Sequence, residues 1–102
     1  MPTIVVLFNL KPGASISQYE AWAKEKDIIT VKSLNSVADF RVLKMNNLLG
    51  TETPSPYQYC ELIEIIDMKV FFAELSNESV QAGAKVFNEF VDNPLFIEAN
   101  SI

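Results

Sequence analysis

Two polar side chains that could do chemistry alternate along one predicted strand, over residues 57–66. Tyr59 and Glu61 are two positions apart, so they share a face of the strand and lie roughly 7 Å apart. Together they could hold a polar ligand. If Glu61 is buried without a partner its pKa rises, which makes it the candidate general acid or base. The alternative role is a hydrogen bond across a dimer interface, and Glu64 on the opposite face is the competing carboxyl group.

Three further side chains are candidates for binding a ligand: Asn9, Trp22 and Arg41. The amide of Asn9 could meet a carbonyl or pyrrole group, or could form a turn where its strand ends. The ring of Trp22 could stack on a flat conjugated ligand, or belong to the core. Arg41 is the only arginine; it could bind a carboxylate or carbonyl oxygen, pair with Glu61 or Glu64, or keep an edge strand polar.

The composition excludes several classes of catalyst. The 102 residues contain no His, which excludes Ser-His-Asp and Cys-His relays and every His-ligated metal or haem. The single cysteine, Cys60, cannot form a thiolate cluster, and no cation near it in the sequence favours a nucleophile over a small buried hydrophobe. We therefore expect no metal and no cofactor, and no recognisable catalytic machinery beyond Glu61.

Charge and hydropathy limit the partners and the compartment. A net charge of −5 argues against a nucleic-acid or anionic-membrane surface. No apolar run approaches the length of a membrane span. The chain enters a β-branched run directly after Met1-Pro2, without the basic segment of a secretory leader, and it holds one lone thiol. We therefore expect a cytoplasmic protein.

The hydrophobic pattern predicts one α+β domain over residues 1–102, with strands at 3–10, 37–49, 57–66 and 95–99. Capping boxes at Ser15 and Ser17 begin a first helix, which we expect to loosen near Ile29. Asp67 caps a second helical region, which ends at Asp92-Asn93-Pro94. The order βαββαβ is that of a ferredoxin-like fold, a four-stranded antiparallel sheet with two helices on one face.

The first strand is apolar at both parities, so both faces of the sheet should be covered. Two helices cover only one face. A second copy of the same sheet, related by a two-fold axis, would cover the other. We therefore expect a homodimer through sheet-to-sheet packing, as in the dimeric α+β barrels.

Six segments that span nearly the whole chain share a pattern with a known family: Thr3-Ile-Val-Val-Leu-Phe-Asn-Leu-Lys-Pro-Gly13, Tyr19-x-x-Trp22, Ser36-Val37-x-x-Phe40-Arg41-Val42, Ser55-Pro56-Tyr57-x-Tyr59-x-Glu61-x-Ile63, Asp67-Met68 and Pro94-Leu95-Phe96-Ile97. In this pattern the chain resembles the REDY-like (HapK-type) family. The resemblance implies a small dimeric ferredoxin-like protein encoded among genes for red tripyrrole pigments of the prodigiosin type. Residues 46–47 and 51–54 match no pattern of that family.

Three functions follow as hypotheses. The first, which the resemblance implies, is an accessory protein of prodigiosin-type pigment biosynthesis that binds a small conjugated pyrrole-like intermediate between sheet and helices. The second is a cofactor-independent monooxygenase or cyclase, as in other members of the superfamily, although a shared fold does not carry chemistry over. The third is a structural partner of another enzyme of the pathway.

Overall fold

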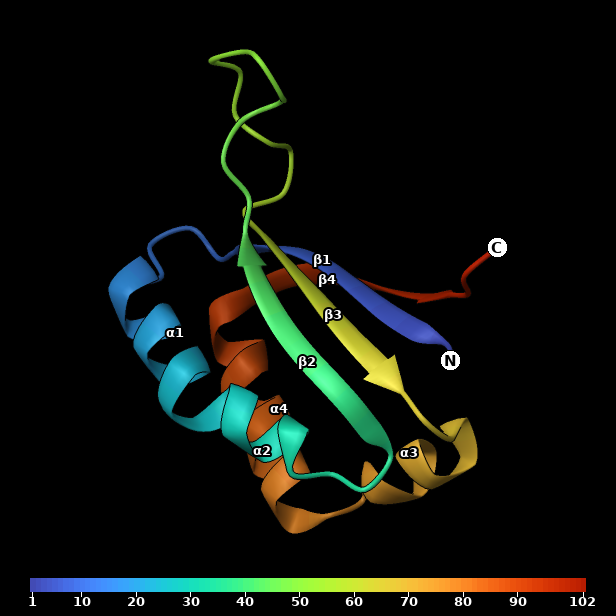
Figure 1. The fold of residues 1–102 in the computed structure, drawn as a ribbon. Coiled ribbons are helices and arrows are strands. Elements are labelled where there is room, and N and C mark those ends of the chain that lie inside the picture. The colour runs from blue at the N-terminus through green and yellow to red at the C-terminus, as the bar shows by residue number, and fades with distance from the viewer.

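Four antiparallel strands form one sheet in the order β2-β3-β1-β4, with the helices on one face (Figure 1). The computed structural model describes residues 1–102. It confirms the predicted ferredoxin-like βαββαβ order, with each helical region divided into shorter segments. The elements are β1 (Thr3–Leu10), α1 (Ile16–Trp22), the π-helical turn η1 (Ala23–Asp27), α2 (Ile28–Lys32), β2 (Val37–Lys44), β3 (Tyr59–Ile65), α3 (Met68–Glu74), α4 (Glu78–Phe90) and β4 (Val91–Ala99).

The first helical region begins as its sequence predicts and changes its hydrogen bonding one turn earlier than expected. The Ser15 side chain caps α1 by accepting a hydrogen bond from the Gln18 amide. The helix does not loosen at Ile29 but at η1, where the Ile28 amide donates to the carbonyl of Ala23, five residues back. Single π-helical turns inside α-helices occur frequently at functional sites. Asp27, the last residue of η1, is therefore of interest for the site.

The end of β2 and the beginnings of β3 and β4 differ from the prediction, since β3 begins at Tyr59 and not at residue 57. β2 ends at Lys44, and residues 45–58 form a long loop that extends away from the body of the molecule (Figure 1). β4 begins at Val91, directly after α4, whereas the sequence predicted it from residue 95. Asp92-Asn93-Pro94 does end the helix, but Asn93 takes a φ of 43°, and the pairing with β1 shifts between Leu7 and Asn9. This irregularity lets the strand absorb a Pro that would otherwise interrupt it.

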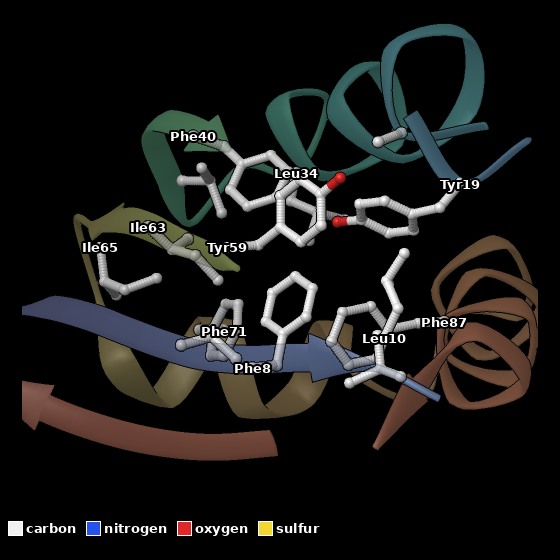
Figure 2. Packing of buried hydrophobic residues seen from close by; sticks show 14 residues of the cluster. Phe8, Leu10, Tyr19, Leu34, Phe40, Tyr59, Ile63, Ile65, Phe71 and Phe87 are labelled. Atoms are coloured by element: carbon white, nitrogen blue, oxygen red, sulfur yellow. The ribbon is translucent and has the colours of Figure 1, made fainter. Parts of the chain in front are cut away.

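A cluster of aromatic rings fills the space between the helices and one end of the sheet (Figure 2). Phe8 of β1 is fully buried at its centre. Its ring lies 5.9 Å from that of Tyr19 on α1, 5.6 Å from that of Tyr59 on β3, and 5.1 Å from that of Phe87 on α4. These contacts connect α1 and α4 to the two central strands, β1 and β3.

The opposite face of the sheet has no helix over it and carries apolar side chains beside charged ones such as Arg41 and Glu64. The strand register places seven apolar side chains there: Val5, Leu7, Leu43, Cys60, Leu62, Leu95 and Ile97. The exposed fractions of Leu43, Leu95 and Ile97 are 39%, 46% and 42%. None of the helices is both long enough and apolar enough to cross a bilayer.

Candidate functional site

A cavity of about 310 Å³ lies between the sheet and the helices. Its volume is at the lower end of the ~300 to 1,000 Å³ range of small-molecule sites. Most of its wall is aliphatic or aromatic, including Val31, Leu34, Phe40, Ile63, Phe71 and Phe87. Figure 2 shows Leu34, Phe40, Ile63, Phe71 and Phe87 among the side chains packed between the two layers. The cavity is therefore suited to a small ligand with an apolar body.

Glu61 is the buried polar group of this cavity. It lies on β3 opposite Val6 of β1 and Val42 of β2, on the face that the helices cover. Its exposed fraction is 6%, and its Oε2 has no hydrogen-bond partner. Burial, and then the nearby charge of Asp27, raise the pKa of the Glu61 carboxyl to about 8. Glu61 thus faces the cavity and not the uncovered face of the sheet.

Asp27 is a second carboxyl group on the cavity wall, contributed by η1 from the helical side. Burial raises its pKa to about 6. The three ion pairs of the protein involve neither Asp27 nor Glu61, and no Lys or Arg lines the cavity. The remaining polar wall residues are uncharged: Thr30, Ser79 and Asn88. Two carboxyl groups without a basic partner therefore share one apolar space.

A separate polar cluster lies beside the cavity. The Tyr59 hydroxyl donates to Oε2 of Glu20 at 2.6 Å, and Nζ of Lys44 lies 3.0 Å from the same oxygen. These two contacts lower the pKa of Glu20. The buried Tyr19 hydroxyl has no partner, and burial, with the nearby charge of Glu61, raises its pKa. Both tyrosines are therefore neutral near pH 7.

The structure does not bring the five sequence-predicted binding residues into one site. Only Glu61 lines the cavity. Tyr59 shares its face of β3, as predicted, but binds Glu20. Trp22 is half-buried and its ring stacks against that of Phe90, with the centroids 6.2 Å apart.

Asn9 and Arg41 lie elsewhere for identifiable reasons. The Asn9 amide donates to the Pro56 carbonyl at 3.1 Å, and its oxygen accepts from the Gln58 amide at 2.9 Å, so it anchors the long loop. Arg41 points to the uncovered face, because its register partner is Leu62. Its Nε lies 3.8 Å from Asp39 rather than beside Glu61 or Glu64.

Sequence reasoning missed Asp27. The signal was a charged residue at an apolar-stripe position, since Tyr19, Ala23 and Asp27 recur at four-residue spacing on one helix face. Tyr19 and Ala23 are both buried. An acidic residue that continues a buried stripe has to face either the core or a cavity.

Known proteins share this fold and the sequence pattern. The family model of the REDY-like protein HapK matches residues 2–102. The chain belongs to the HapK family. The crystal structure of HapK from Hahella chejuensis is 24% identical, with a TM-score of 0.72, 100% of this chain covered and 95% of that chain. No curated protein matches.

Other solved structures share the fold at lower sequence identity. A protein of Arabidopsis thaliana, At3g17210, is 16% identical, with a TM-score of 0.81 over 100% of this chain and 96% of that one. A protein of unknown function from Bacteroides fragilis, described as dimeric with a ferredoxin-like fold, is 14% identical, with a TM-score of 0.68 over 98% and 95% of the chains. Family and fold together support a small accessory or ligand-binding protein.

The raised pKa values predict how stability depends on pH. Between about pH 4.5 and pH 8 the folded protein holds a proton on Glu61 that the unfolded chain has released, so the free energy of unfolding falls as the pH rises. Asp27 acts in the same direction up to about pH 6. We expect Glu61→Gln to exceed the parent in unfolding free energy by about 3 kcal/mol at about pH 9, and by less than about 1 kcal/mol at about pH 5.

Urea unfolding followed by circular dichroism across this pH range measures the effect. Glu64→Gln is the matched control, because Glu64 lies on the same strand but faces the other side, where it accepts a hydrogen bond from Thr3. The control should keep the parent's pH dependence. An unchanged pH dependence in Glu61→Gln would contradict the buried, unpaired carboxyl group.

Proposed function

We propose that this HapK-family protein is an accessory protein of prodigiosin-type pigment biosynthesis that binds a small conjugated pyrrole-like intermediate in the cavity between sheet and helices. Family membership supports the pathway, since the family is typified by HapK and implies a place among genes for tripyrrole pigments. The chemistry of the cavity supports the ligand class.

One observation carries the proposal: the unpartnered Oε2 of Glu61 in a mostly apolar cavity. A buried polar atom without a hydrogen bond is costly, and a ligand that supplies the bond recovers that cost. A pyrrole N–H is a donor on a flat apolar ring. These two properties match the carbonyl oxygen that the Glu61 carboxyl group keeps when protonated and the surrounding Phe40, Phe71 and Phe87 side chains.

The aromatic wall favours a flat conjugated ligand over a flexible aliphatic one. Ring-to-ring contacts are worth roughly 0.5–1.5 kcal/mol beyond the area that they bury. Phe87 belongs both to the cavity wall and to the cluster around Phe8, so its ring is held in place by packing. A wall held in place by packing and a buried carboxyl group would restrict the orientation of a bound intermediate.

Gly83 of α4 offers a way to fill the cavity without disturbing the core. It lines the cavity, and a Cβ added there would meet no heavy atom within 4 Å. Leu favours a helix over Gly by roughly 0.5–1 kcal/mol, so Gly83→Leu should fold well. We expect the parent to bind bipyrrole in isothermal titration calorimetry and Gly83→Leu to bind it at least about tenfold more weakly.

Ala82→Leu is the control for this experiment. Ala82 precedes Gly83 on the same helix, is exposed, and does not line the cavity. It should bind bipyrrole like the parent. Failure of the parent to bind bipyrrole, or equal binding by Gly83→Leu, would overturn the proposed site.

We further propose a homodimer formed by packing the uncovered faces of two sheets. Six of the seven apolar side chains on that face, all except the buried Cys60, would otherwise remain at least partly in water, and their burial is worth about 25 cal/mol per Å². The Bacteroides fragilis protein of the same fold is described as dimeric, which supports a dimer.

The dimer is tested by measuring its mass and by introducing one charged side chain into the uncovered face. The chain has a mass of 11.4 kDa, and we expect sedimentation to give twice that value. Leu62 lies on a central strand of the uncovered face, so Leu62→Lys should yield monomers. Phe72→Lys on α3 changes an apolar side chain that is 64% exposed, and should leave the dimer intact. A monomeric parent, or a dimeric Leu62→Lys, would contradict sheet-to-sheet packing.

We place the protein in the cytoplasm. Its only cysteine, Cys60, is a free thiol, and the structure has no disulfide. A free thiol is in keeping with a reducing compartment.

A further inference from the structure

Asp27 and Glu61 reach the same cavity from opposite layers of the fold. Glu61 projects from β3 in the sheet, and Asp27 from η1 in the helical layer. They are close enough for the charge of Asp27 to act on Glu61. A ligand in the cavity would lie against both carboxyl groups, which is the arrangement of a proton donor and a proton acceptor on one substrate.

Because burial raises the pKa values of both carboxyl groups, Asp27 and Glu61 together hold one proton near neutral pH. The pKa of Asp27 is about 6 and that of Glu61 about 8, so at pH 7 Asp27 is ionised and Glu61 is protonated. No cation lines the cavity to hold both as anions.

The other titratable groups nearby do not change the number of protons that Asp27 and Glu61 hold near pH 7. Tyr19 and Tyr59 have raised pKa values and stay neutral. Glu20 is held by Tyr59 and Lys44. The remaining nearby groups are the exposed residues Glu25, Lys24 and Lys26 of η1 and, on the uncovered face of β3, the thiol of Cys60, whose pKa is raised by burial.

We propose that Asp27 and Glu61 are an acid–base pair that catalyses a proton shift in a conjugated carbonyl compound bound in the cavity. The Asp27 carboxylate takes a proton from the carbon next to the carbonyl group. The electrons of that C–H bond form a carbon–carbon double bond, and the carbonyl oxygen receives the Glu61 proton. The product is the enol.

Reversal of the two transfers, to the same or a conjugated carbon, restores Asp27 as carboxylate and Glu61 as acid. The net reaction is an isomerisation, so atoms and electrons balance without an oxidant or reductant. This inference rests on the proposed function, because it assigns a reaction to the ligand of the same cavity.

Acetylpyrrole, with the acetyl group next to the ring nitrogen, is a suitable probe because it joins a pyrrole N–H to an enolisable carbonyl. We expect the protein in D2O to accelerate exchange of the methyl protons for deuterium, measured by proton NMR. Asp27→Asn and Glu61→Gln should each lower the catalysed rate at least about 100-fold, since positioned acid–base groups contribute roughly 10²–10⁴-fold.

Two carboxyl-to-amide variants serve as matched controls. Glu25→Gln changes an exposed residue of the same π-helical turn as Asp27, and Glu64→Gln changes the opposite face of the same strand as Glu61. Both should keep the parent's rate. The rate should depend on pH as a bell with limbs near pH 6 and pH 8. In Glu61→Gln, the rate that remains should no longer fall above about pH 8, because no Glu61 proton is left to be lost.

The outcomes separate this inference from the binding proposal. Binding of acetylpyrrole and bipyrrole is measured by calorimetry on the same samples. Binding without accelerated exchange, or exchange that neither Asp27→Asn nor Glu61→Gln slows, overturns the acid–base pair and leaves the binding site standing. If the protein binds neither acetylpyrrole nor bipyrrole, both the binding site and the acid–base pair are overturned.

Discussion

The rest of the structure depends on the packing of rings around Phe8. Its contacts with Tyr19, Tyr59 and Phe87 fix the distance between the helices and the sheet at one end of the molecule. Farther along α4 the side chains facing the sheet become small, with Gly83 and Ala84 on the cavity wall. The two layers cannot close on side chains of this size while the rings hold them apart. The small residues of α4 therefore leave part of the space between the two layers unfilled.

Successive side chains of β3 point to opposite faces of the sheet, and this alternation places a carboxyl group among the core residues. On β3 the period of two that turns Tyr59 and Ile63 toward the helices also turns Glu61 inward. A buried carboxyl group without a hydrogen bond costs stability, and no ion pair offsets this cost. Perturbed, unpaired groups of this kind cluster at functional sites. Asp27, placed by a π-helical turn on the opposite wall, completes a site that lies within one chain.

Local pattern was sufficient to predict the element order, the bounds of β1, and the face that Glu61 shares with Tyr59. It failed where distant partners decide the outcome. The Asn9 amide is occupied by a loop nearly fifty residues away, which no local pattern encodes. Arg41 alternates with Phe40 and Val42, so its outward direction followed from the strand once the covered face was known. β4 begins early because Asn93 accommodates a positive φ, a choice of backbone conformation that its sequence alone leaves open.

Near neutral pH the cavity holds a protonated Glu61 whose Oε2 has no hydrogen-bond partner within the protein. An NMR titration of the side-chain carboxyl carbons, assigned with Glu61→Gln and Asp27→Asn, tests it most directly. Glu61 should titrate with a pKa of about 8 and Asp27 with a pKa of about 6. Bound bipyrrole should shift both resonances. Titration of Glu61 near its ordinary value of 4.5 would contradict the account, because it would mean that water already solvates the carboxylate.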